Sequence, residues 1–185
     1  NDGNALIAYH RQGGTLFGKL WNARAGLRPG EFSIGPPPRI LINRPFIAAV
    51  ADGYVLCWGE TEAHRARLHF ARLNEKGETI KHAVLAERVV ALTSFDCRLN
   101  TASLRVMWAE ATNAGPQRFT QSFDLDGAPV AAAQPILPGS EMASSASFAD
   151  ATTDGVWWLT ETELRREPLA QAIDRAASHS ADAHR

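Results

Sequence analysis

The chain has 185 residues, of which 45% are hydrophobic and 21% charged, so it can bury one sizeable core. Nineteen basic and twenty acidic residues give a formal net charge of −1, which provides no long-range field to hold nucleic acid or an acidic membrane. No stretch approaches the roughly 18 uninterrupted apolar residues of a membrane span. We therefore expect no nucleic-acid partner and no membrane span.

A block of about fifty residues recurs along the chain, marked by an aromatic residue at Tyr9, Trp58, Trp108 and Trp158. A period of this length indicates a repeat architecture. The first three aromatics each end a short apolar run typical of a strand, namely ALIAY at 5–9, YVLCW at 54–58 and LRVMW at 104–108. Runs this short leave no room for long helices.

The first unit continues with two further predicted strands. TLFGKLW at 15–21 mixes apolar and polar residues, as half-buried antiparallel strands do. The turn WNARAG follows, and its closing Gly26 can adopt the positive φ that a tight hairpin requires. PGEFSI at 29–34 is the next strand, and PFIAAV at 45–50 is the inner strand of the second unit.

The second and third units repeat this order. The asparagine or aspartate in each turn is expected to cap the turn through its side chain. Together with the inner run, these elements predict four antiparallel strands per unit. In the second unit, the second strand is RLHFARL at 67–73, the turn glycine is Gly77 and the third strand is ETIKHAV at 78–84. In the third unit, these elements are RFTQSF at 118–123, Gly127 and APVAAAQPI at 128–136.

Four antiparallel strands repeated about every fifty residues are the plan of a β-propeller blade. From about Asp2 to Thr160 the chain resembles the divergent β-propeller repeats of secreted bacterial proteins, in the pattern Asp-Gly, apolar strand ending in Trp, loop, strand, Asp-x-x-Gly, strand. No named subfamily matches, and NEKGETI at 74–80 resembles a sialidase Asp-box only loosely. The resemblance implies a secreted, periplasmic or cell-surface protein. The sequence begins at Asn1 without a leader, which indicates a processing site or an artificial boundary.

The frame of the repeats predicts two complete and two partial blades. Asp2 and Gly3 match Asp52 and Gly53, so we expect the sequence to open at the second strand of its first blade. The stretch 147–160 supplies the first two strands of a fourth blade. The predicted fold is therefore all-β, a partial β-propeller of four-stranded antiparallel blades over 1–162, with a short C-terminal helix.

The C-terminal segment changes its periodicity. EPLAQAIDRAAS at 167–178 places Leu169, Ile173 and Ala176 on one face, with Pro168 at the first helical position, where proline is tolerated. We therefore assign 163–178 to an amphipathic helix and 179–185 to a frayed tail.

The repeated tryptophans have two interpretations. A Trp that ends an apolar strand at the repeat period usually packs between neighbouring sheets, so we expect Trp58 and Trp108 to be buried at equivalent positions. A row of sugar-stacking platforms is the alternative. Trp157 and Trp158 are adjacent, and because neighbouring strand residues face opposite sides, one of the two should meet a partner or solvent.

Cys57 and Cys97 fall on strands of successive units that can approach within disulfide range. An even cysteine count in an exported protein permits one bridge, and two buried free thiols fit the sequence equally well. None of the six histidines forms a zinc signature with a cysteine or with another histidine, so we predict no metal site and no cofactor.

Catalytic patterns are absent from the sequence, which contains no G-x-S-x-G elbow, P-loop or G-x-G-x-x-G. The loops after the repeat aromatics are the best surface candidates, because in a propeller they gather on one face of a rigid scaffold. The candidate ligand- or partner-binding residues are Glu60, His64, Arg65, Arg67, Glu110, Arg118 and Trp157.

Three functional classes follow. We favour a non-catalytic structural or interaction subunit whose incomplete propeller is completed by other chains, which are copies of itself, a different protein or the remainder of a processed precursor. The second class is a glycan-binding propeller, in which tryptophan and tyrosine stack on sugar rings. The third is a sialidase-like hydrolase, for which the scattered arginines show no cluster. We therefore favour a chain that is not an enzyme.

Overall fold

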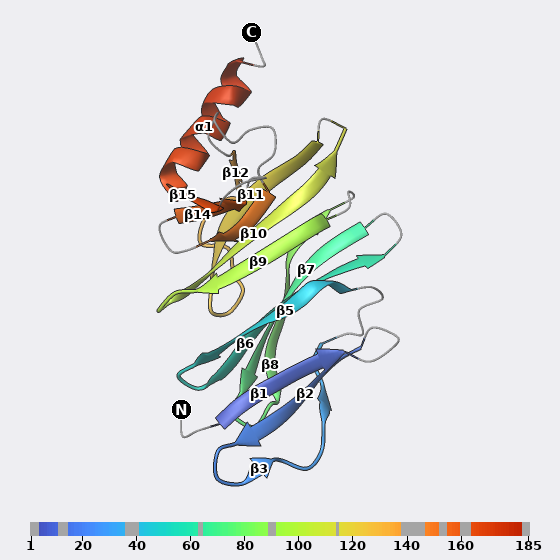
Figure 1. Cartoon of the computed structure of the whole chain (residues 1–185). Coiled ribbons are helices and arrows are strands. Elements are labelled where there is room, and N and C mark those ends of the chain that lie inside the picture. Colours follow the sequence, from blue (N-terminus) through green and yellow to red (C-terminus); the bar gives the residue numbers. More distant parts are fainter. Residues whose placement is uncertain are drawn as a thin grey trace.

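The computed structural model describes residues 4–10, 15–35, 41–62, 65–88, 92–113, 115–137, 147–151, 155–159 and 164–182. Four antiparallel sheets and one helix make up this part of the chain (Figure 1). We name the sheets A to D in chain order. Their strands and the C-terminal helix confirm the all-β class and the four-stranded antiparallel units.

Sheets A and B contain the first two repeat units. In sheet A, both short strands pair with β2, whereas sheet B is a meander in chain order. Sheet A consists of β1 (Asn4–His10), β2 (Leu16–Asn22), β3 (Gly26–Leu27) and β4 (Phe32–Ser33). Sheet B consists of β5 (Leu41–Val50), β6 (Gly53–Glu62), β7 (Arg65–Asn74) and β8 (Thr79–Arg88).

Sheets C and D follow the same plan. Sheet C is again a four-stranded meander, and the described part of sheet D has three strands followed by the helix. Sheet C consists of β9 (Leu92–Leu99), β10 (Ser103–Thr112), β11 (Gly115–Asp124) and β12 (Gln134–Ile136). Sheet D consists of β13 (Ser147–Ala151), β14 (Gly155–Leu159) and β15 (Leu164–Pro168), and α1 (Leu169–Asp182) comes next.

The turns after β2, β7 and β11 have the predicted chemistry. Gly26, Gly77 and Gly127 adopt φ values of 74°, 82° and 80°, a conformation that side-chain-bearing residues rarely take. A side-chain oxygen closes each turn from inside: Asn74 Oδ1, for example, accepts hydrogen bonds from the backbone N–H groups of Lys76 and Glu78, both at 3.0 Å. These contacts fix where each hairpin reverses.

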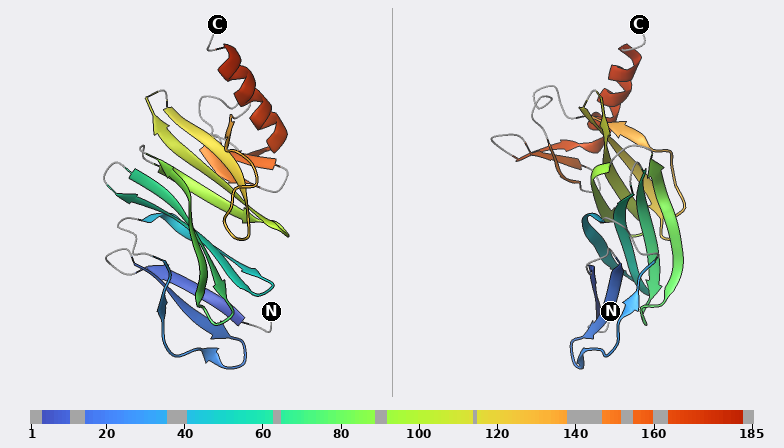
Figure 2. Two further views of the ribbon diagram at one scale, coloured as in Figure 1. Left: turned by 180° about the vertical axis from the view of Figure 1, so that it is seen from behind. Right: turned by 90° about the vertical axis from the view of Figure 1, so that its right-hand side faces the viewer.

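The sheets stack face to face in chain order, and α1 packs against β12 of sheet C and against β14 and β15 of sheet D (Figure 2). Alternation along β6 creates both interfaces of sheet B. Leu56 and Trp58 belong to the core shared with sheet A, whereas Val55 and Cys57 belong to the core shared with sheet C. All four side chains are at most 2% exposed. The central sheet is therefore buried on both faces.

The C-terminal segment corrects the predicted helix boundaries. Residues 164–168 form β15, a third strand of the fourth unit, where we expected the start of a helix at 163. Glu167 precedes Pro168, and the proline ring disfavours the helical conformation for the residue before it. The helix therefore begins at Leu169, and it continues to Asp182 through part of the predicted tail.

The helix packs through small side chains. Leu169, Ala172 and Ala176 are buried, and Ile173 is half-buried, so the predicted apolar face is correct apart from the addition of Ala172. Glu167 and Arg175 form an ion pair that joins β15 to the helix. Among the described residues, no helix is long and apolar enough to cross a membrane.

Gly53, at the β5–β6 turn, should be the glycine least tolerant of substitution. Its φ is 148°, and a Cβ there would lie 2.0 Å from the carbonyl oxygen of Leu73, which is part of the β6–β7 pairing. We expect Gly53→Ala to lower the free energy of unfolding by about 3 kcal/mol, measured by urea denaturation. Gly26→Ala is the matched control.

A Cβ at Gly26 meets nothing within 4 Å, although its φ is also positive. The control should therefore lose only about 1 kcal/mol, the cost of a left-handed conformation. Equal losses in the two variants would show that the contact with the Leu73 carbonyl has no effect.

Candidate functional site

An aromatic pair spans the same two strands in each of the first three units. The two partners occupy directly opposed register positions in every case. The ring centroids are 6.1 Å apart for Tyr9 and Phe17, 5.1 Å for Trp58 and His69, and 5.6 Å for Trp108 and Phe119. Trp58 and Trp108 are 1% and 2% exposed, which confirms that they are buried at equivalent positions.

A buried glutamate lies two residues beyond each of these tryptophans. In sheet C, Glu110 accepts hydrogen bonds from Trp108 Nε1 at 2.8 Å and from Arg88 Nε at 2.7 Å. The Arg88 guanidinium also lies over the Trp108 ring, 5.7 Å from its centroid. Because Arg88 belongs to β8, this carboxylate ties sheet B to sheet C.

Sheet B uses its equivalent glutamate differently. Glu60 Oε1 lies 2.9 Å from His69 Nε2, without the alignment of a hydrogen bond, and 3.4 Å from Arg67 Nη1. His69 Nδ1 lies 3.2 Å from His82 Nε2. The Trp58 indole N–H is buried and has no hydrogen-bond partner in the described part of the chain. We call Glu60, Arg67, His69 and His82 the polar cluster of sheet B.

The surroundings shift the pKa of two members of the polar cluster, His82 and Arg67. Partial burial lowers the pKa of His82, and the neighbouring His69 lowers it further, while Glu60 acts in the opposite direction. Hydrogen bonding to Glu87, and then to Glu60, raises the pKa of Arg67. His82 is therefore held in its neutral form to lower pH than a free histidine.

The structure brings some of the predicted site residues together and separates others. Glu60 and Arg67 contact each other, and Arg65 forms a 3.6 Å ion pair with Glu87 beside them. Glu110 occupies the equivalent place in sheet C. His64 lies outside the described residues, and Trp157 lies on β14 opposite Arg166, with its side chain outside the described part.

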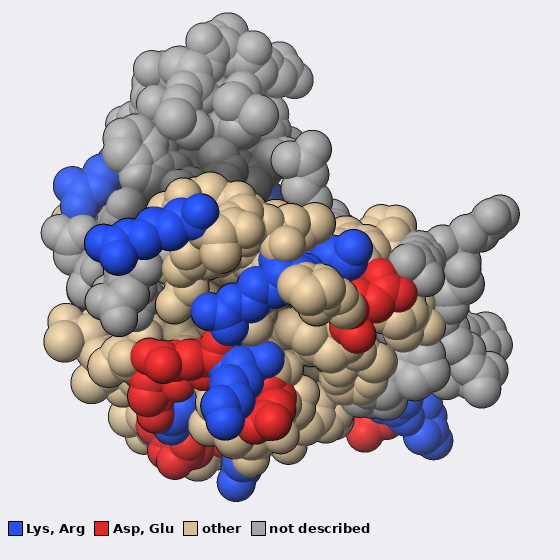
Figure 3. All heavy atoms as spheres, turned by 90° about the horizontal axis from the view of Figure 1, so that it is seen from below, with Lys and Arg blue, Asp and Glu red and all other residues tan. Residues whose placement is uncertain are grey.

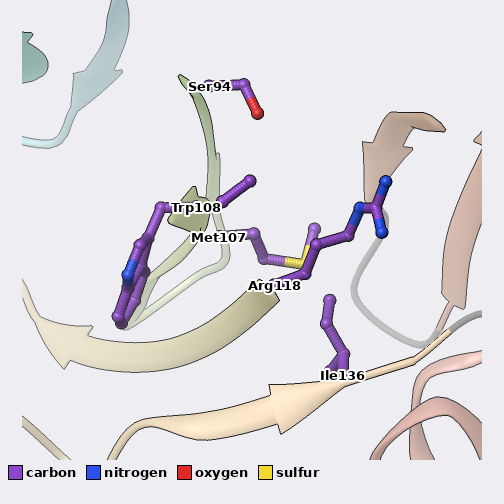
Figure 4. Close-up of a pocket in the computed structure, with 6 residues that line it drawn as sticks. Ser94, Met107, Trp108, Arg118 and Ile136 are labelled. Carbon is purple, nitrogen blue, oxygen red and sulfur yellow. The ribbon is translucent and has the colours of Figure 1, made fainter. Parts of the chain in front are cut away.

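Arg118 lies on the opposite face of sheet C from Glu110. Figure 4 shows Met107, Arg118 and Ile136 on one side of the sheet and the Trp108 ring on the other. Arg118 is half-buried, and this burial lowers its pKa. The two candidates therefore do not form one site, because residues of odd and even register point to opposite faces.

The sequence did not single out four residues of these clusters, His69, His82, Glu87 and Arg88. The repeat could have identified one of them, His69. It lies opposite the repeat aromatic, at the position that Phe17 and Phe119 occupy in the other units. The others belong to β8, whose pairing with β7 shifts register twice. Their positions depend on those shifts, which no sequence pattern marked.

Two hollows among the described residues are both small. The cavity of Figure 4, lined by Ser94, Met107, Trp108, Ala109, Arg118 and Ile136, has a volume of about 10 Å³, roughly the space of one water molecule. An open hollow of about 260 Å³ beside Arg28, Glu31 and Lys76 is also below the roughly 300 Å³ at which small-molecule sites begin. No group of three or more potential metal ligands occurs in the described ranges.

The two cysteines face each other across the interface of sheets B and C. Both are buried and unbridged in the structure. Burial raises the pKa of the Cys97 thiol, and a hydrogen bond with Cys57 contributes in the same direction. The pair is adjacent, as expected, and its oxidation to a disulfide stays a prediction.

Comparison with known proteins leaves the family unassigned. No family model matches the sequence, and no curated protein matches it. A crystal structure of an uncharacterized protein from Listeria monocytogenes EGD-e, determined at 1.18 Å, is similar with a TM-score of 0.44 and 11% sequence identity. The alignment covers 91% of this chain and 51% of that protein, so the chain spans about half its length.

The two buried tryptophans should contribute strongly and unequally to stability. Trp58→Ala and Trp108→Ala should each lower the free energy of unfolding by about 3 to 5 kcal/mol through lost packing and cavity formation. Trp108→Phe should cost about 1 kcal/mol more than Trp58→Phe, because only Trp108 donates to a buried carboxylate. Urea denaturation of the four variants measures both differences. Identical losses for the two Phe variants would contradict the assigned hydrogen bond.

The stability of the protein should depend on His82 at mildly acidic pH. Because the folded state lowers the pKa of His82 from its ordinary 6.5, the unfolded chain binds more protons as the pH falls. This histidine therefore makes the folded state less stable as the pH falls from about 7 towards its lowered native pKa, below which the effect levels off. Urea midpoints should fall more steeply with acidification in the wild type than in His82→Gln. Parallel curves would contradict the prediction.

Proposed function

We propose that the chain is a non-catalytic interaction subunit whose stack of sheets continues on another protein chain. The observation that carries this proposal is the exposure of the outer face of sheet A, the face turned away from sheet B. Cross-strand partners share a face, so the pairing of β1, β2 and β3 defines this surface. Its residues are Ala5, Ile7, Tyr9, Phe17, Lys19, Trp21 and Leu27.

Equivalent positions in the next two units are buried. Ile7 is 46% exposed, whereas Leu56 and Val106, which also lie two residues before the repeat aromatic, are 0% and 1% exposed. Sheet A covers Leu56 and sheet B covers Val106. The same side chain position is thus buried wherever a preceding sheet packs on it.

A second set of positions gives the same result. Trp21 is 39% exposed, while its equivalents Leu73 and Phe123 are 0% and 1% exposed. Leu27, which pairs with Trp21, is 51% exposed. Large apolar side chains gathered on one exposed sheet face are typical of an interaction surface.

The face of sheet A that covers sheet B within the molecule indicates which chemistry a partner should present to the outer face of sheet A. Leu6, Leu16 and Leu20 form the face of sheet A that packs on sheet B. A partner sheet that presents a similar aliphatic face would cover Ile7, Trp21 and Leu27. Figure 3 views the molecule from the sheet A end, where acidic and basic side chains lie side by side. Apolar complementarity rather than net charge should therefore select the partner.

We infer further that the sheets are blades of a partial β-propeller, in which other chains supply the missing blades. Successive four-stranded meanders packed face to face support this arrangement. The interface should exceed roughly 2,000 Å² in total, as in obligate assemblies. The secreted, periplasmic or cell-surface location implied by the resemblance is part of this proposal.

A glycan-binding function receives less support. Trp58 and Trp108 are buried between sheets and present no ring to a sugar. Among the described aromatics, Tyr9, Phe17 and Trp21 remain on the outer face of sheet A, where they lie among aliphatic side chains suited to a protein partner.

Ile7→Lys should disrupt the proposed assembly without unfolding the chain. The new charge would be buried at the interface, next to Lys19, so we expect the dissociation constant to rise at least about tenfold, or about 1.4 kcal/mol. Sedimentation equilibrium of the purified chain measures this shift. Val130→Lys is the matched control, because Val130 is 64% exposed and lies away from sheet A. A wild-type chain that stays a folded 20.1 kDa monomer at every concentration would overturn the proposal.

A further inference from the structure

The two cysteines of the chain meet in one inter-sheet contact. They are separated by 40 positions in the sequence, and both side chains belong to the apolar core between sheets B and C. Cys57 lies on β6 and Cys97 on β9, and β9 packs against both β5 and β6. A hydrogen bond joins the two thiols. All the thiol groups of the sequence are therefore collected at a single place in the fold.

Packing alone does not require thiols at this contact. Ala8 is equivalent to Cys57, because each directly precedes the aromatic of its repeat unit. Ile47 is equivalent to Cys97, because each lies on the first strand of its sheet, opposite the residue two positions before the repeat aromatic. Ala8 and Ile47 pack in the core between sheets A and B. The same two positions thus hold apolar side chains in one interface and thiols in the next.

The folded chain shields this contact from reagents in solution. Cys57 and Cys97 are 2% and 1% exposed. Burial raises the pKa of the Cys97 thiol, which lowers its fraction of reactive thiolate at neutral pH. Thiol–disulfide exchange requires a thiolate that an outside disulfide can reach. The unfolded chain meets both conditions, whereas the folded chain meets neither.

We propose that Cys57 and Cys97 form a disulfide across the interface of sheets B and C while the chain folds in an oxidising medium, and that the folded chain then keeps the redox state it acquired. The bridge joins β6 to β9 within one chain, so it forms whether or not a partner chain is bound.

Oxidised glutathione can supply the oxidant in a balanced exchange. One cysteine thiolate attacks a glutathione sulfur, breaks the S–S bond of glutathione and releases one glutathione thiolate. The other cysteine thiolate then attacks the protein sulfur of this mixed disulfide, which forms the bond between Cys57 and Cys97 and releases the second glutathione thiolate. The two cysteines lose two electrons and two protons, and one oxidised glutathione becomes two glutathione thiols.

The bridge should stabilise the fold chiefly by restricting the unfolded chain. It closes a loop of about forty residues, and a covalent link of this span removes many of the conformations open to an unfolded chain. The two thiols are already neighbours in the folded chain. The bond therefore restricts the unfolded chain much more than the folded one.

Refolding of the full chain under two redox conditions tests the proposal. The chain is unfolded and reduced in urea, then refolded by dilution into either a mixture of reduced and oxidised glutathione or reductant alone. Alkylation under denaturing conditions, followed by intact-mass analysis, counts the free thiols. We expect no alkylated cysteine in the monomer after oxidative refolding and both cysteines alkylated after reductive refolding. Urea denaturation should give an unfolding equilibrium constant at least about a hundredfold smaller for the bridged chain.

A second measurement tests whether oxidation is coupled to folding. The reductively refolded chain is freed of reductant and exposed, still folded, to the same glutathione mixture. Its cysteines should be oxidised at least about tenfold more slowly than those of the chain kept unfolded in urea. Equal rates would overturn the inference. Free thiols, glutathione adducts or a bridge between two chains as the main product of oxidative refolding would also overturn it.

The double variant Cys57→Ala and Cys97→Ile is the matched control. It places at the interface of sheets B and C the apolar pair that Ala8 and Ile47 form between sheets A and B. Its unfolding equilibrium constant should be the same after both refolding procedures. A control that gains as much stability from oxidative refolding as the wild type would show that the bridge is not the cause. The thiol count of the wild type does not depend on this variant.

Discussion

Face-to-face packing of successive sheets is the interaction on which the remaining structure depends. A strand presents side chains alternately to two faces, so each sheet needs a neighbour on both sides to bury its apolar residues. Sheet B has both neighbours, and Leu56 and Val55, on its opposite faces, are each 0% exposed. Sheet A has one neighbour in the described part, which is why its outer face is exposed although its sequence pattern is that of an inner sheet.

The polar cluster of sheet B shows what happens when the repeat changes one partner of its aromatic pair. Where sheet C has Phe119, sheet B has His69, and the ring nitrogen of His69 approaches Glu60. The equivalent carboxylate in sheet C instead accepts the tryptophan N–H. This one difference between the units moves a carboxylate from an indole to an imidazole and leaves Trp58 Nε1 without a partner in the described part. Such departures from a repeat are expected where a position carries a special role or a special cost.

Much of this fold could be predicted because its determinants are local. Short apolar runs ending in an aromatic, and turns closed by Gly26, Gly77 and Gly127, depend on neighbouring residues alone, and the structure contains them at the predicted places. The burial of Trp58 and Trp108 followed from their repeat position.

The candidate site was harder to predict from the sequence. Glu60, Arg65 and Arg67 lie near one another, while Arg118 is on the opposite face of its sheet from Glu110. Partners such as Arg88 and Glu87 depend on the register of β8, and β15 depends on tertiary pairing with β14, which its charged sequence does not indicate.

Apolar contacts alone do not fix how one sheet is rotated on the next, because the hydrophobic effect has no direction. Directional contacts at the interface of sheets B and C supply this constraint. At one end, Arg88 of sheet B contacts Glu110 of sheet C. At the other, Arg72 of sheet B lies 2.8 Å from both Asp52, in the β5–β6 turn, and Asp126, in the turn after β11. The hydrogen bond from Arg72 lowers the pKa of Asp52, which keeps this carboxylate charged for the contact. The aspartates of the Arg72 pairs are exposed, and such ion pairs contribute little free energy. Their effect, like that of the Arg88–Glu110 contact at the buried end, is geometric: these contacts orient two sheets whose burial the apolar residues already stabilise.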